Sequence, residues 1–113
     1  MSELPSLREL LGDEAALLLI EKCGGTRIVV PQYITPTHDL RAQLGDEVFI
    51  DLVRYFGGTR LFVPIARQWR IDMYSSQKLT QAQMARKIGC AETWVQRVLR
   101  KKRENREQMA LDF

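Results

Sequence analysis

The stretch LTQAQMARKIGCAETWVQRVLRKK, residues 79–102, decides how the C-terminal part of this chain folds. Thr80 followed by Gln83 matches a capping box, in which two side chains satisfy free N–H groups at the start of a helix. Gly89 falls where that helix must end and reverse, because glycine adopts a positive φ at little cost. The stretch therefore predicts two helices joined by a tight turn, which is the arrangement of a helix-turn-helix.

Both predicted helices have an apolar face and a polar face. Met84 and Ile88 are four residues apart and share one face of the first helix, while Val95 and Val98 point inward from the second. The outer face of the second helix carries side chains that can pair with base edges, since Arg pairs with guanine, Gln with adenine and Glu with the amine of cytosine. The helix around residues 91–102 is therefore predicted to read the major groove of DNA. The candidate DNA-binding residues are Gln81, Glu92, Thr93, Gln96, Arg97, Arg100, Lys101, Lys102 and Arg103.

A basic run extends along this helix and just beyond it. The mobile positive charge that phosphate contacts need comes from Arg97, Arg100, Lys101, Lys102, Arg103 and Arg106. An alternative stays open, because helix pairs with a central glycine also occur in proteins that never touch DNA. In such a protein the polar outer face is simply solvated.

Charge is unevenly distributed along the chain. Up to Pro64 there are 6 Lys and Arg residues against 9 Asp and Glu, a net charge of −3, and the remainder has 11 against 5, a net charge of +6. The first part is expected to be a scaffold and the second part a binder of polyanions.

Other classes of function are disfavoured by the sequence. The longest apolar run, residues 15–20, is too short to cross a bilayer, and no secretory signal pattern is visible. Cys23, Cys90 and the single histidine, His38, lack the spacing of metal ligands. No nucleophile–base pair can be named, so we expect neither an enzyme nor a cofactor. A reducing cytoplasm fits the cysteine content best.

The first two-thirds of the chain contains an internal repeat with an offset of 33 residues. Residues 7–31 align with residues 40–64 without a gap, and 13 of the 25 aligned positions are identical. Two copies are too few for a solenoid, so a pseudo-twofold pair is expected.

Each copy predicts the same elements. A short helix ends at Gly12 or Gly45, and a second helix follows, capped by Asp13 or Asp46. Apolar stripes at helical spacing are formed by Ala16, Leu19, Ile20 and Cys23 in one copy and by Phe49, Leu52, Val53 and Phe56 in the other. A Gly-Gly pair ends each second helix.

A β-rich run, TRIVV or TRLFV, follows each glycine pair and is stopped by Pro31 or Pro64. A lone strand is unstable, so the two runs are expected to form a small antiparallel ribbon. The partner is either the other copy or the same strand of a second chain.

Two connecting segments carry further expectations. Thr35 and Pro36 have the pattern of a cap and a first helical residue, and His38 is expected to be exposed. Ile65, Trp69 and Met73 are spaced four apart and predict a supporting helix ahead of the motif. The predicted fold is thus mainly α with a small antiparallel β ribbon. Its parts are a duplicated scaffold at 1–64, a helix-turn-helix region at 65–106 and a tail at 107–113.

The stretch FGGTRLFVP, residues 56–64, together with the amphipathic residues 47–55 and the motif at 81–100, resembles the Mor transcription-activator family of phage middle-operon regulators. The resemblance implies a dimeric DNA-binding activator that contacts RNA polymerase. The segment between Pro64 and the motif looks short for that family. The second copy of the helix–strand unit also offers, within one chain, contacts that a single-copy relative makes by dimerising.

The leading expectation is a sequence-specific regulator of transcription that binds double-stranded DNA, with a homodimer favoured. The alternative is a small adaptor or scaffold without affinity for DNA. The tail QMALDF, residues 108–113, is similar to short peptides that bind bacterial sliding clamps, with Gln first, Leu fourth and an aromatic residue sixth. That pattern arises often by chance, and an apolar tail that folds back on the protein is the stronger reading.

Overall fold

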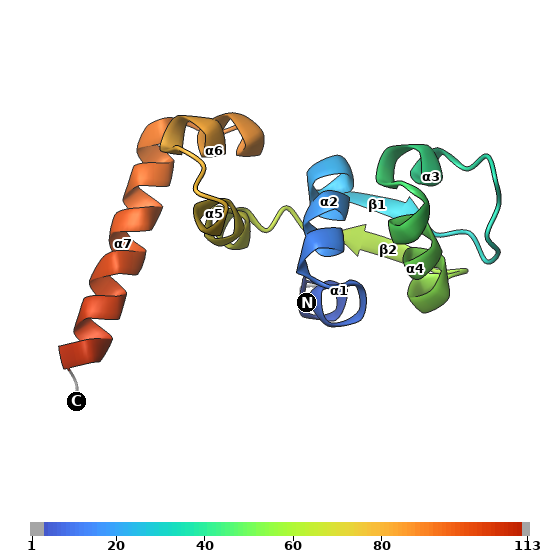
Figure 1. Ribbon diagram of the computed structural model, residues 1–113, viewed down its shortest axis with the longest axis horizontal. Helices are drawn as coiled ribbons and strands as arrows, with labels where there is room; N and C mark the ends of the chain where they lie inside the picture. The colour runs from blue at the N-terminus through green and yellow to red at the C-terminus, as the bar shows by residue number, and fades with distance from the viewer. Residues whose placement is uncertain (1–3, 112–113) are drawn as a thin grey trace. The chain divides into compact units, whose positions relative to one another are not determined.

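The structure is a computed structural model that describes residues 4–111, with only the backbone described for residues 109–111. The chain divides into two compact units, Met1–Ala66 and Arg67–Phe113 (Figure 1). The described part is mainly helical with one two-stranded antiparallel sheet, as the sequence predicted at that level.

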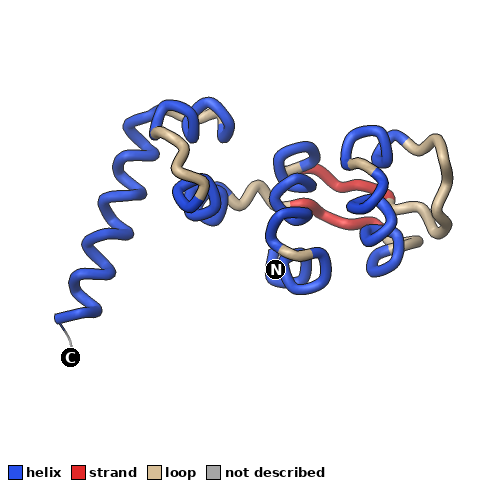
Figure 2. Tube along the Cα trace, in the orientation of Figure 1, coloured by secondary structure: helices blue, strands red, loops and turns tan. Residues whose placement is uncertain are grey.

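The first unit alternates helices with two short strands. Its elements are α1 (Leu4–Leu11), α2 (Asp13–Cys23), β1 (Thr26–Val29), α3 (Asp39–Leu44), α4 (Asp46–Phe56) and β2 (Arg60–Val63). The two strands pair antiparallel within the chain, with Ile28 opposite Leu61. Figure 2 shows this ribbon in red between the helices of the unit. The predicted ribbon is therefore confirmed, and its partner strand lies in the same chain.

Contacts around the two copies of the sequence repeat recur with the same offset of 33 residues. Helices α2 and α4 each have 11 residues. Asp13 Oδ1 accepts a hydrogen bond from Arg8 Nε at 2.9 Å, and Asp46 Oδ1 accepts one from Arg41 Nε at 2.8 Å. Equivalent residues thus make equivalent contacts in both halves of the unit.

The glycine pairs end the helices and admit the strands. A Cβ at Gly24 would lie 2.5 Å from the carbonyl oxygen of Ile20, and one at Gly57 would lie 2.5 Å from that of Val53. The φ of both glycines is −55°, which any residue adopts. Glycine is therefore favoured at these positions because a side chain would collide with the helix, and not because of the backbone conformation. The next glycine of the second pair, Gly58, donates to Val30 O at 3.0 Å and extends the ribbon.

The core of the first unit includes the predicted apolar stripes except Phe56, which is only half-buried. Helices α2 and α4 contribute most of it, and the ribbon adds its inner side chains. The fully buried residues include Leu7, Ala16, Leu19, Ile20, Val30, Phe49, Leu52 and Val63.

The predicted helix caps of this unit are wrong in detail. Asp13 and Asp46 are the first residues of α2 and α4, and the N-cap positions are held by Gly12 and Gly45 with no side-chain cap. Each glycine has a φ near +90°, at 88° and 85°. The aspartates pair instead with the arginines five residues earlier, because the glycine turn brings them into reach.

The connection before α3 also differs from the prediction. His38, and not Thr35, caps α3, since its Nδ1 accepts a hydrogen bond from Leu40 N at 3.1 Å. The imidazole is half-buried and stacks on Phe49 with 5.7 Å between ring centroids. Strand β2 ends at Val63, directly before Pro64, as predicted. Strand β1 ends at Val29, so that Val30 separates it from Pro31.

The second unit consists of α5 (Arg67–Ser76), α6 (Gln81–Ile88) and α7 (Glu92–Leu111). The predicted supporting helix exists, but Ile65 lies outside it because Ala66 takes a left-handed φ of 50°. Arg70, Ile71 and Tyr74 form the buried face of this helix in place of the predicted stripe.

Helix α7 is longer than the sequence predicted. It continues to Leu111, so the segment expected to be a separate tail begins inside the helix. Phe113, the aromatic residue of the clamp-peptide pattern, lies outside the described residues.

We expect Gly57→Ala to destabilise the protein by about 1–3 kcal/mol, because its Cβ would press on a backbone oxygen that cannot rotate away. Chemical denaturation measures the free energy of unfolding. The exposed Ala42→Ser on α3 serves as the control and should change that energy by less than about 0.5 kcal/mol. Equal unfolding energies for the two variants would contradict the close approach.

Candidate nucleic-acid interface

The start of α6 is fixed by the predicted capping box. Gln83 N donates to Thr80 Oγ1 at 3.2 Å, and Thr80 N donates to Gln83 Oε1 at 2.8 Å. Both free N–H groups are thus satisfied by side chains. The prediction for the first helix of the motif is confirmed.

The turn between α6 and α7 is formed at Gly89. This residue adopts the left-handed conformation with φ 81° and ψ 39°. Ala85 O accepts hydrogen bonds from Gly89 N at 2.8 Å and from Cys90 N at 3.0 Å, which closes the helix end. Only three residues therefore separate the two helices, and α7 starts in a fixed direction.

Arg70 connects α5 to the end of α6. Its side chain is 6% exposed, and Nη2 donates to Lys87 O at 2.9 Å while Nε donates to Tyr74 Oη at 3.2 Å. The acceptor at Lys87 belongs to the last turn of α6, where the helix dipole favours a cation. Sequence reasoning did not identify this residue, because an arginine on a short helix has the same local pattern whether it is buried or solvated.

One face of the unit gathers six of the nine predicted DNA-binding residues. Residues from α6 and α7 line a shallow hollow of about 370 Å³, and five of the six are exposed. The lining residues are Gln81, Thr93, Gln96, Arg97, Arg100 and Arg103. Among the described side chains, three guanidinium groups and no carboxylate line this hollow. Its chemistry therefore suits an anionic partner that also offers hydrogen-bonding groups.

The remaining predicted residues divide between two places. Glu92 and Lys101 are exposed but do not line the hollow, and Lys101 lines another hollow with Gln68 and Lys102. Lys102 faces the other way: its Nζ lies 2.6 Å from Asp72 Oδ1 and donates to Gln68 O at 3.3 Å. The structure therefore places Lys102 against α5 and apart from the residues that line the hollow. The cause is helix geometry, because a residue two positions from Arg100 points to the opposite side.

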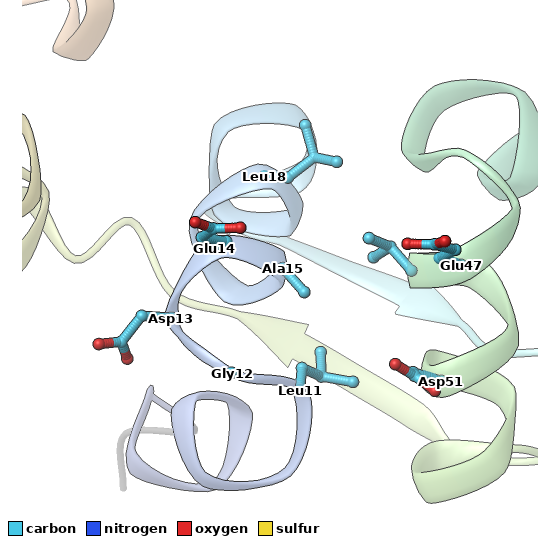
Figure 3. Close-up of a pocket in the computed structure, with 9 residues that line it drawn as sticks. Leu11, Gly12, Asp13, Glu14, Ala15, Leu18, Glu47 and Asp51 are labelled. Carbon is cyan, nitrogen blue, oxygen red and sulfur yellow. The ribbon is translucent and has the colours of Figure 1, made fainter. Parts of the chain in front are cut away.

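A second hollow, of about 540 Å³, lies in the first unit between α2 and α4. Figure 3 shows Glu14 on α2 and Glu47 and Asp51 on α4 around it, with Leu11 and Ala15 on the α2 side. Carboxylates beside apolar side chains favour a cationic, partly apolar partner. This hollow has the opposite charge to the one beside α7.

In the part of the chain that the structure describes, the cysteines and acidic residues form no metal centre. Burial raises the pKa of the Cys23 thiol above its ordinary value, which keeps it neutral. Within residues 4–111, no three His, Cys, Asp or Glu side chains gather closely enough to hold a metal ion. None of the helices described there combines the length and apolar content that crossing a membrane requires.

No family model, curated protein or solved structure matches this chain. The function must therefore be inferred from the chain's own geometry and charge.

We expect Arg70→Ala to lower the free energy of unfolding by about 1–3 kcal/mol, because it removes a buried side chain and its part-buried hydrogen bond to the Lys87 carbonyl. Urea denaturation followed by circular dichroism gives this energy. Arg67→Ala removes an exposed arginine from the same helix and should cost less than about 0.5 kcal/mol. A similar loss in both variants would show that Arg70 does not join the two helices.

Proposed function

We propose that this chain is a sequence-specific regulator of transcription that binds double-stranded DNA. In this proposal α6 and α7 form a helix-turn-helix, and the N-terminal half of α7 reads the major groove. The observation that carries the proposal is the exposed hollow where Gln96, Arg97 and Arg100 lie together.

The order of side chains along α7 suits such a contact. Recognition helices use their N-terminal residues for base edges, and here those positions hold Thr93, Gln96 and Arg97. Arg100 and Arg103 follow one turn later, where a helix leaving the groove passes the phosphates. Positive charge supports the same assignment, since residues 67–113 carry 11 Lys and Arg against 5 Asp and Glu.

We further propose that the first unit is a duplicated helix–strand region with a pseudo-twofold axis. The recurrence of the Arg8–Asp13 contact as Arg41–Asp46 supports this, as does the pairing of Ile28 with Leu61, which are equivalent positions of the repeat. By its resemblance to the Mor family, the protein is proposed to be a phage-type activator that acts in the cytoplasm and contacts RNA polymerase.

The alternative is an adaptor protein without affinity for DNA. The acidic hollow between α2 and α4 favours this reading, because Glu14, Glu47 and Asp51 could receive a basic segment of another protein. Titration of duplex DNA at several salt concentrations separates the two, since a DNA-binding protein shows a steep loss of affinity with salt and an adaptor shows no binding.

Selection of bound sequences from random duplexes should yield a defined site. On that site we expect Arg97→Ala and Gln96→Ala each to lose about 1–3 kcal/mol of discrimination at one base position. Lys101→Ala should weaken binding to all duplexes. Lys102→Ala is the matched control, because its ammonium group is already held by Asp72 and should contribute little. An Arg97→Ala protein with unchanged affinity and preference would rule out α7 as the reading helix.

We expect the protein to be a homodimer that reads two half-sites about 34 Å apart. Sedimentation at micromolar concentration measures the mass in solution, and the selected site should be palindromic. A monomer bound to a non-palindromic site would instead assign the symmetry to the duplicated unit of a single chain.

A further inference from the structure

Four charged residues follow one another along a single face of α7. Arg97, Arg100, Glu104 and Glu107 are separated by three or four residues, so they share that face. All four are exposed, and neither glutamate belongs to an ion pair in the described part of the chain. The sign of the charge thus reverses along the face that the proposed function turns toward DNA.

The length of α7 makes this reversal matter. The helix has 20 residues, which span about 30 Å, whereas the major groove is about 12 Å wide. Only part of the helix can occupy the groove at one time. A specific complex therefore needs a feature that selects which part of α7 enters the groove.

We propose that Glu104 and Glu107 are specificity-determining residues that fix the position of α7 along its own axis in the groove. This inference rests on the proposed function and concerns the same surface. The two carboxylates lie beyond the duplex when the N-terminal residues face the bases, and they meet phosphates when the helix is displaced.

The effect of the two glutamates follows from a displacement of four residues, about 6 Å along the axis of α7. Moved by four residues, Arg97 and Arg100 take the places of Thr93 and Gln96. Glu104 and Glu107 then take the places of Arg100 and Arg103, the two arginines assigned to phosphates. A register that substitutes two carboxylates for two guanidinium groups beside a polyanion is strongly disfavoured.

The hollow lined by arginines ends before the two glutamates. Arg103 is the last α7 residue that lines it, and neither Glu104 nor Glu107 contributes. Repulsive groups placed against the wrong complex are a common source of specificity. If arginines alone contacted the phosphates, α7 would bind at several positions along its axis on DNA of any sequence.

The test compares Glu104→Gln/Glu107→Gln with the wild type on the selected site and on random duplexes at low salt. One carboxylate about 10 Å from a phosphate changes affinity about twofold in water. We therefore expect affinity for random duplexes to rise about fourfold in the double variant, while affinity for the selected site changes less than twofold. Glu9→Gln/Asp39→Asn, at two exposed positions of the first unit, gives the same change in net charge and should leave both affinities nearly unchanged.

Three results would overturn the assignment. Random-duplex affinity could stay constant, it could rise equally in the control variant, or it could rise by the same factor as affinity for the selected site. A large fall in the thermal midpoint of the double variant alone would make these glutamates structural. A wild-type protein that binds no duplex at all would overturn the proposed function itself, which is a separate outcome.

Discussion

Backbone pairing between β1 and β2 is the constraint on which the first unit depends. Each strand has only four residues, and a two-stranded ribbon is marginal without a covering layer. The helices supply that layer, since Leu61 and Val63 are buried beneath them. The glycine pairs make the arrangement possible, because each one ends a helix and lets a strand begin within two residues. Ribbon and helices are therefore stable only together.

Local signals in the sequence predict most of this fold, and contacts between distant residues account for what they miss. Thr80 and Gly89 act on the backbone within a few residues, so the ends of α6 are predictable. The cap by His38 is not, because its imidazole is held in place by Phe49, a residue of the following helix. Arg70 is missed for the same reason, since its acceptor belongs to another helix. The pairing of the strands was predicted, but the chain that supplies the partner could not be.

Helical periodicity divides the basic residues of α7 between two tasks. Arg97 and Arg100 face the open hollow, while Lys102 joins α7 to α5 through Asp72. In the sequence these cations form one continuous run, and composition alone gives them all the same role. The structure separates them because 3.6 residues complete a turn. Six of the nine predicted interface residues lie together as a result.

Because both strands belong to one polypeptide, formation of the ribbon does not depend on protein concentration. Two chains that share a ribbon separate when their concentration falls below the dissociation constant. Here the connecting residues 30–59 keep the strands at a high effective concentration, so the ribbon forms equally well at nanomolar and micromolar protein. The two halves are also encoded separately and are free to diverge. Leu18 and Asp51 occupy equivalent positions of the repeat beside the acidic hollow, and identical subunits could not differ in this way.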